Sequence, residues 1–431
     1  MSTIYTTITT ITKNLTKSIK NSAIFKTIFK ILRFFEAKWQ ESYLKQYYPS
    51  KNFLSFLKKS EILNKKIFHP LIILLVFAIF LLLSFSGVRK SLEINLIIAF
   101  ISFFIGAEIV PYLLLNKKNN MKLPNFGMDE IYSIGLCLIM IGIIFFILCV
   151  GSVGGLPLIQ TSLRYSLSPS LTMPVFLIIP GIGMVASTYL MRYKENKINR
   201  SQTRFRFLLL FLLSAFILLC LAYRTPVIAV LLMLVIMGYT GEILSVWEVI
   251  VAALLGVSGI IGLGYYRVME EGTLTKNMSP LSTLQTRADF TLHVLNLLDS
   301  VSGDYGILHG KLLLSSIPGS ALGPRMLIGK LIAWRSEVTV TPTLIGQMIV
   351  DFGRIGVTLG MFIIGFILGI GYKIIKKTKD SFLIFLYALL LTYTILGVET
   401  GILDIQVIFY FIIGLFIYLV IIFKNIGFKT K

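Results

Sequence analysis

The chain has 431 residues, of which 56% are hydrophobic and 14% charged, and its formal net charge is +21 at pH 7. A mean hydropathy of +0.84 excludes a water-soluble domain of this length and predicts an integral membrane protein. Lys and Arg concentrate in short segments between apolar runs, which is the ordinary signal of membrane topology. The net charge therefore requires no nucleic-acid partner, although it favours contact with anionic membrane lipids.

Ten apolar runs recur along the chain, and each is about long enough to cross a hydrocarbon core of about 30 Å as a helix. Runs of this length without polar alternation indicate helices rather than barrel strands. The predicted fold is all-α: a polytopic transmembrane helical bundle of about ten spans, with a large exterior loop carrying short helices. The runs cover 68–87, 94–115, 130–151, 171–190, 207–223, 225–241, 248–265, 355–375, 381–397 and 405–423.

The charge pattern also predicts the orientation, because positively charged short loops remain in the cytoplasm. With the basic N-terminus inside, an even number of spans places both termini in the cytoplasm and the largest loop outside the cell membrane. For the N-terminal arm, an interfacial amphipathic helix and a disordered segment both fit the pattern. The four predicted parts are a basic cytoplasmic or interfacial arm at 1–66, a membrane domain with spans 1–7 at 67–265, the exterior loop at 266–354, and spans 8–10 with a basic tail at 355–431.

The exterior loop is much longer than a connection requires, so we expect it to carry function. A helix is predicted to begin at Pro280, since proline suits the first helical position. On this helix Gln285, Asp289, His293 and Asn296 share one face. That face indicates either a helix lying on the bilayer with one wet side or the roof of a polar cavity.

Further along the loop, the segment SIPGSALGPRMLIGKLIAWRSE is rich in glycine and proline. This density disfavours a continuous helix and favours a re-entrant segment that lines a cavity. Arg325, Arg335 and Glu337 belong to this segment. We therefore expect the two arginines to lie at a functional site.

Four motifs follow one another between residues 130 and 372. They are GGLPL with Arg164 after it, YRTP with Arg224, SIPGS with GPR in the exterior loop, and TPTLIGQMIVDFGRIGVTLGMFIIG, which is the most specific. In this order they resemble the membrane oligosaccharide repeat unit polymerases, relatives of the O-antigen polymerases. Residues 1–66 have no counterpart in the resemblance.

The resemblance implies a glycosyltransferase that polymerises repeat units linked to polyprenyl diphosphate. A growing glycan would pass from one carrier to a sugar hydroxyl on a second carrier-linked unit, at the exterior face. Such an enzyme needs no nucleotide sugar. The sequence has no zinc-ligand spacing and no DxD-like pair, so we expect no metal ion and no cofactor, with a divalent metal held by Asp or Glu as the alternative. The partners of the enzyme would be the lipid-linked oligosaccharide, the membrane lipids, a flippase and chain-length regulator proteins.

The proposed chemistry leaves negative charge on a departing diphosphate, and arginine stabilises such charge with a planar fork of N–H donors. Each candidate arginine also has a structural alternative. Arg224 would otherwise snorkel at a hairpin tip, Arg287 would pair with Asp289 or Asp299, and Arg354 would pair with Asp351. We assign Arg325 and Arg335 to catalysis, and Arg164, Arg224, Arg287, Arg354, Asp289 and His293 to binding of the diphosphate or glycan.

The acceptor hydroxyl must also lose a proton, so a general base is expected on the exterior side. Asp351 and His309 rank ahead of Asp289, His293 and Glu337, because they occupy glycine-rich stretches rather than a regular amphipathic helix. A bound water or the substrate diphosphate would be an alternative base. Asp351 and Arg354 are expected at the water boundary of the site, with an interfacial anchor as the alternative.

Two rival functions share much of this pattern. A lipid-linked oligosaccharide flippase or other transporter would also have many spans, but internal repeats and midplane charges are expected there and none is evident in the sequence. A ligase that moves finished glycan from the same carrier would need the same arginines. Inside the second run, Glu108 is expected to be a buried carboxylate with a partner or a site at membrane depth.

Overall fold

The computed structural model describes residues 67–84, 87–115, 127–270, 280–317, 319–320, 322–333 and 340–426. Within these ranges the chain forms helices and turns, without a strand. The described residues divide between two units: Ile67 and Ser245–Trp247 belong to the first, and Phe68–Leu244 with the described residues from Glu248 onward belong to the second. The second unit contains most of the described residues, whereas the predicted arm at 1–66 lies outside them.

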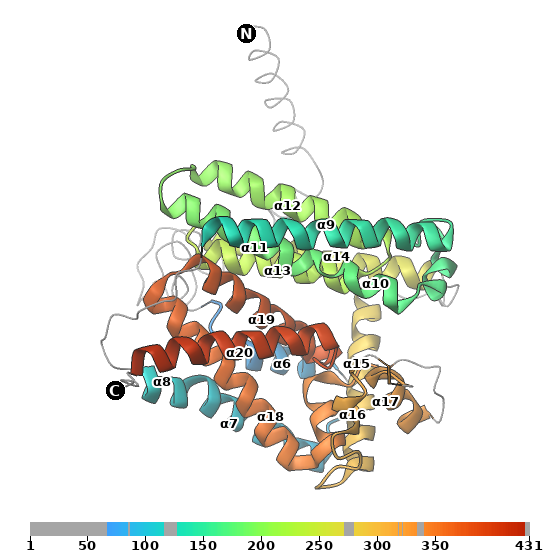
Figure 1. The fold of residues 1–431 in the computed structure, drawn as a ribbon. Coiled ribbons are helices and arrows are strands. Elements are labelled where there is room, and N and C mark those ends of the chain that lie inside the picture. Colours follow the sequence, from blue (N-terminus) through green and yellow to red (C-terminus); the bar gives the residue numbers. More distant parts are fainter. Residues whose placement is uncertain are drawn as a thin grey trace, which may run out of the picture. The chain divides into compact units, whose positions relative to one another are not determined.

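Seven helical segments among the described residues are long and apolar enough to cross a membrane. Three shorter apolar helices, namely α6, α13 and the first part of α14, coincide with the remaining predicted runs, so the predicted all-α membrane fold is confirmed. The helices α6 to α14 (Figure 1) are α6 (Ile72–Leu83), α7 (Lys90–Phe104), the π-helix η1 (Ile105–Ile109), α8 (Val110–Leu115), α9 (Met128–Val153), the 3-10 helix η2 (Thr161–Ser166), α10 (Pro169–Val175), α11 (Ile178–Lys194), α12 (Arg200–Cys220), α13 (Arg224–Thr240) and α14 (Val246–Glu270). The remaining helices are α15 (Pro280–Ser302), α16 (Lys311–Leu314), α17 (Pro324–Ala333), α18 (Thr343–Thr378), α19 (Ser381–Thr400) and α20 (Ile405–Ile426).

One end of the large unit collects basic residues from several turns. The Lys377 ammonium donates to the carbonyl of Leu115 at the end of α8, and that of Lys194 donates to the carbonyl of Lys379. The Lys379 ammonium lies 2.9 Å from the Glu242 carboxylate, which follows α13. The ends of α8, α11, α13 and α18 therefore meet here, and this end of the unit is called the basic end.

The opposite end, called the loop end, collects the other helix termini. The Ser84 hydroxyl, just after α6, donates to the Asp289 carboxylate of α15 over 2.6 Å. The Arg287 guanidinium, also on α15, pairs with Glu399 near the end of α19. The successive apolar helices thus run alternately between the two ends, as the predicted order of spans requires.

Glycines allow α18 to pack closely against α7 and η1. A Cβ atom on Gly365 would lie 2.5 Å from the Phe103 carbonyl oxygen, and one on Gly369 would lie 2.3 Å from that of Ala107. On the facing helix, a Cβ on Gly106 would lie 2.3 Å from the Phe362 carbonyl oxygen. Small residues permit such backbone approach in membrane bundles, so these three glycines let α18 pack directly against α7 and η1.

A group of charged side chains lies near the basic end, around η1. Glu108 projects from this π-helix, and its Oε1 atom lies 2.6 Å from Nε2 of His69, while its Oε2 atom lies 3.9 Å from Nζ of Lys373. The His69 ring also packs edge-on against Tyr372, with the ring centres 4.6 Å apart. Of the two predicted environments, Glu108 therefore has that of a carboxylate with partners.

Helix α18 begins at Thr343, ahead of the apolar run predicted to start at 355. The added segment is helical because one of its faces is apolar, and Leu344, Ile345 and Ile349 are completely buried. The helix breaks at Phe352 and Gly353, where Gly353 has φ 57° and ψ −138°. Glycine is the residue that adopts this conformation readily, and the break divides α18 into two helical halves joined by a kink.

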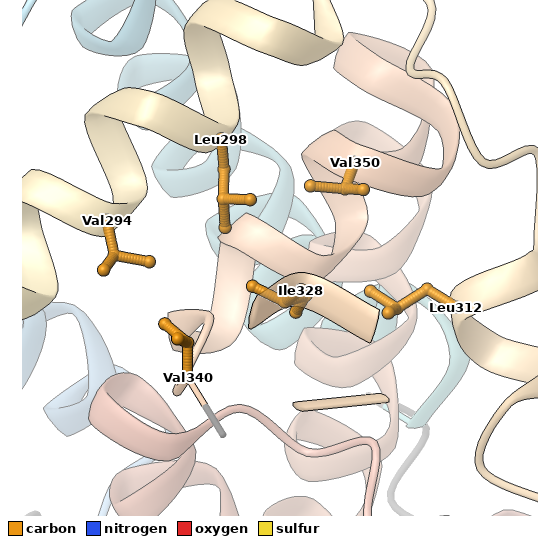
Figure 2. Close-up of a cluster of buried hydrophobic side chains, with 6 residues drawn as sticks. All are labelled: Val294, Leu298, Leu312, Ile328, Val340 and Val350. Carbon is orange, nitrogen blue, oxygen red and sulfur yellow. The ribbon is translucent and has the colours of Figure 1, made fainter. Parts of the chain in front are cut away.

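The described part of the long loop at 266–354, which is predicted to be exterior, forms a small apolar core against the first half of α18 (Figure 2). Its side chains come from α15, α16, α17, the residues before α18, and α18 itself, and each is at most 4% exposed. The predicted glycine- and proline-rich segment, which begins at Ser316, therefore contains one short helix, α17, among its described residues, and α16 ends just before it. The core consists of Val294, Leu298, Leu312, Ile328, Val340 and Val350.

Candidate functional site

The His309 turn, residues 303–310, is attached to the break in α18 through its backbone. The backbone nitrogens of Ile307 and Leu308 donate to the Val350 carbonyl over 2.9 and 3.1 Å, and that of His309 donates to the Asp351 carbonyl over 2.9 Å. His309 has a left-handed φ of 46°, and its side chain is exposed. The turn therefore presents the imidazole to the surroundings from a backbone that α18 holds in place.

Asp351 is 5% exposed, and its carboxylate faces the start of α16. Oδ1 accepts the backbone N–H groups of Gly310 and Leu312 at 3.2 and 3.0 Å, and Oδ2 accepts that of Leu313 at 3.1 Å. Both oxygens thus satisfy backbone donors that the first turn of a helix leaves unpaired. This arrangement differs from an open general base, whose oxygen must reach a substrate proton.

Arg354 follows the break and pairs with Asp304, not with Asp351 as the spacing had suggested. Its Nη2 atom lies 2.8 Å from Oδ1 of Asp304, and its backbone N–H donates to the Asp304 carbonyl over 3.0 Å. The predicted local pair fails because the break at Gly353 interrupts the helical geometry that would bring Asp351 and Arg354 together. Nε of Arg354 is buried and has no acceptor among the described residues.

Two further arginines of the loop pair with carboxylates at the end of α19 and in the turn that follows it. Nη2 of Arg325, on α17, lies 2.8 Å from Oδ2 of Asp404, and Arg287, on α15, pairs with Glu399. The predicted partners of Arg287 on its own helix are therefore wrong, because the side chain projects toward α19. All four groups of these pairs are 38–47% exposed, so water and a ligand can compete for them.

The polar face of α15 packs against protein along part of its length. Neither predicted setting, the bilayer surface or the roof of a polar cavity, therefore describes the whole face. Asp289 accepts from Ser84, and the Asn296 side chain exchanges hydrogen bonds with the backbone of Arg89 and Gly87 over 3.1 and 3.0 Å. The face therefore binds the segment between α6 and α7. His293 lies on the exposed side of α15.

A second cluster joins two motifs of the resemblance at the α12–α13 turn. The backbone N–H of Leu158, the last residue of GGLPL, donates to the Cys220 carbonyl over 3.1 Å. The Arg164 guanidinium carbon lies 5.5 Å from the ring centre of Tyr223, and Arg224 is the next residue. Arg164 thus packs against the ring of Tyr223, the residue directly before Arg224 in the chain, and two cationic residues at this turn are suited to an anionic ligand.

The two clusters belong to different parts of the loop end. Helix α13 packs mainly against α11, α12 and α19, whereas α15 packs mainly against α18, α6, α7 and α17. Arg335 and Glu337 lie outside the described residues. Across the ranges that the structure covers, no three His, Cys, Asp or Glu side chains gather as metal ligands would.

The ion-pair partners Asp304, Glu399 and Asp404 were missed by sequence reasoning. A signal was available for Asp304, since Gly303 and Gly306 on either side, both with positive φ, indicate a tight turn. For Glu399 and Asp404 the local sequence indicates only a turn between two apolar helices. Nothing in it identifies an arginine partner far away along the chain.

The family model described as "Putative O-antigen polymerase" matches residues 66–411, which is most of the chain. An uncharacterized protein of Methanocaldococcus jannaschii is 27% identical over 318 residues, covering 73% of this chain and 83% of the relative. No solved structure matches. The family match includes both arginine clusters, the long loop at 266–354 and the break in α18, and the resemblance seen in the motifs is confirmed. This chain belongs to the O-antigen polymerase family.

Proposed function

We propose that the protein extends a glycan by moving it from a polyprenyl diphosphate carrier to a sugar hydroxyl on a second carrier-linked repeat unit. Membership of the family supports a membrane polymerase role. The observation that carries the finer proposal is the position of the candidate arginines. All five that are described, Arg164, Arg224, Arg287, Arg325 and Arg354, belong to the loop end.

The orientation of the protein follows from charge. The basic end would face the cytoplasm, because positively charged short loops are retained there. The loop end would then face the exterior of the cell membrane, where lipid-linked repeat units are joined. Helix α6 begins just after His69, which contacts Glu108 near the basic end, and an even number of spans would bring the end of α20 to the same side, so both chain termini would be cytoplasmic.

The donor needs positive charge at its leaving group. When the bond between the anomeric carbon and the diphosphate oxygen breaks, the diphosphate keeps the electron pair and becomes more negative. Arg164 and Arg224 would hold the diphosphate beside Tyr223. Arg325 would exchange its half-exposed partner Asp404 for a phosphate oxygen, at a small cost because such exposed pairs contribute only about 0.2–1 kcal/mol.

The acceptor needs a base as its hydroxyl oxygen attacks the anomeric carbon. Of the two leading candidates, His309 has an exposed side chain, and a neutral imidazole accepts a proton readily near neutral pH. Asp351, whose oxygens both accept backbone N–H groups, would instead position the His309 turn. The leaving diphosphate already activates the donor, so this scheme uses neither a nucleotide sugar nor a metal ion.

The test compares Arg325→Gln with Asp404→Asn in purified protein supplied with lipid-linked repeat units. Both variants break the same ion pair and are adjusted to equal membrane abundance. If Arg325 stabilises the leaving group, only Arg325→Gln should lower the rate of polymerisation, by about a hundredfold. Equal losses from both variants would show that the pair is structural, and unchanged polymer in both would remove Arg325 from the site.

The product identifies the reaction class in the same assay. Long chains on the lipid carrier support a polymerase. Transfer of whole glycan to an acceptor other than a carrier-linked unit would indicate a ligase instead. Movement of repeat units across a sealed vesicle membrane, without a change in their length, would indicate a flippase.

A further inference from the structure

Two tyrosines and two arginines meet near the basic end of α9, α11 and α12, which lie together in the bundle (Figure 1). The Arg192 guanidinium carbon lies 5.6 Å from the ring centre of Tyr132, and that of Arg206 lies 4.8 Å from the ring centre of Tyr189. The two rings are 6.4 Å apart, centre to centre. These four side chains, called the tyrosine–arginine cluster, form a continuous series of contacts across three helices.

The cluster holds two positive charges that no carboxylate among the described residues balances. In the described part of the chain, neither Arg192 nor Arg206 donates to a carboxylate or a backbone carbonyl. Arg204, on the same helix, donates to the Ile243 carbonyl and lies 2.7 Å from the Glu248 carboxylate. Helix α12 thus supplies one arginine whose partners are internal and one whose N–H donors are available to a ligand.

The position of the cluster along the helices corresponds to the lipid headgroup level. Each of its residues lies within about two helical turns of the end of its helix. Tyrosine prefers this level because its ring is apolar and its hydroxyl polar, and arginine is favoured on the cytoplasmic side. All four side chains are half-buried, so they remain accessible from outside the bundle.

Exposed apolar side chains lead from the cluster toward the middle of the membrane. On α9, Leu136 and Met140 follow Tyr132 at helical spacing and are 40% and 57% exposed. On α12, Leu209 and Leu213 follow Arg206 and are 48% and 43% exposed. A soluble anion would have no contact with these side chains, whereas the acyl chain of a lipid would cover them.

We propose that the tyrosine–arginine cluster binds the phosphate headgroup of an anionic membrane lipid, with its acyl chains along α9 and α12. The guanidinium forks match phosphate oxygens, and the tyrosine hydroxyls supply further donors. The negative surface potential of the cytoplasmic leaflet favours the same ligand. The site lies at the end opposite Arg224, so it does not depend on the proposed transfer reaction.

The test uses the purified full chain in nanodiscs that contain phosphatidylglycerol diluted in phosphatidylcholine. Native mass spectrometry measures how much phosphatidylglycerol the protein retains. Each of Arg192→Gln and Arg206→Gln should weaken retention about tenfold, as expected for the loss of a charge-assisted hydrogen bond. Lys197→Gln removes the same charge from the neighbouring α11–α12 turn, where Lys197 is 64% exposed, and should leave retention unchanged.

Arg206→Lys distinguishes a loss of lipid recognition from a loss of folding, because the variant keeps the positive charge but loses the planar fork of N–H donors. Retention lower than native, at an unchanged melting temperature in phosphatidylcholine alone, would support the site even if the glutamine variants fold poorly. Native-level retention in Arg206→Lys and in both glutamine variants would overturn the proposal. So would equal thermal stabilisation of native protein by inorganic phosphate and by phosphatidylglycerol, since the ligand would then be a soluble anion.

Discussion

The Asp351 carboxylate accepts the backbone N–H of Leu312 at 3.0 Å, so a side chain at the break in α18 caps the first turn of α16. Asp351→Asn keeps one acceptor oxygen but turns an amide donor toward the N–H of Leu313. We expect a loss of about 1–3 kcal/mol in the free energy of unfolding. Thermal unfolding in detergent measures it, and a variant of native stability that makes no polymer would instead assign Asp351 to proton transfer.

The proposed proton-accepting role of His309 is tested by His309→Asn. Asparagine tolerates the left-handed φ of 46°, so the turn should keep its shape, but an amide is not a base. The polymerisation rate should fall by about a hundredfold or more, with an unchanged melting temperature. A rate within about twofold of native would exclude His309, since general-base catalysis contributes far more than that.

The break in α18 requires glycine at position 353. A Cβ atom on Gly353 would lie 2.1 Å from the Asp304 carbonyl oxygen, in a backbone conformation that other residues rarely adopt. Gly353→Ala should therefore destabilise the protein by at least about 3 kcal/mol and displace the His309 turn.

A matched control for this substitution is Gly259→Ala in α14. A Cβ there meets no atom within 4 Å, so alanine should be neutral or stabilise the helix by up to about 1 kcal/mol. Hydrogen exchange of residues 303–313 reports the displacement of the turn. Exchange rates at the native level in Gly353→Ala would show that the turn does not depend on the break.

The contact between His69 and Glu108 is expected to stabilise the junction of α6 with η1. Glu108→Gln should lower the free energy of unfolding by about 1–3 kcal/mol, because Lys373 and His69 lose a shared partner. His69→Gln in the same background should then cost less than it does alone, by about 0.5 kcal/mol or more. Strictly additive losses in this double-mutant cycle would mean that the 2.6 Å contact contributes no coupling.

The membrane spans and their order were predictable from sequence, since each depends on a local run of apolar residues and on the charge of the short loops. The start of α18 was not predictable in this way. Its first half is amphipathic and rests on the loop core around Leu312 and Val350, so its helical state depends on tertiary packing. A search for long apolar runs overlooks such a segment.

The chemistry of the candidate site was predictable only as residue types. Arginines and a histidine in the exterior loop indicate anion binding and proton transfer, but their partners come from distant positions. Arg287 and Glu399 are separated by an entire membrane hairpin, and the role of Asp351 depends on a helix of four residues. Such contacts follow from the fold, and no local spacing specifies them.

The two halves of the long loop are attached to the membrane helices in different ways. The His309 turn is held by backbone hydrogen bonds to Val350 and Asp351, which a substrate has no means of replacing. Arg325 is held at its tip by an exposed carboxylate, which a phosphate would displace under the proposed function. In that scheme the acceptor would stay bound at a fixed turn, while the arginine that holds the donor diphosphate would release the spent carrier after each addition.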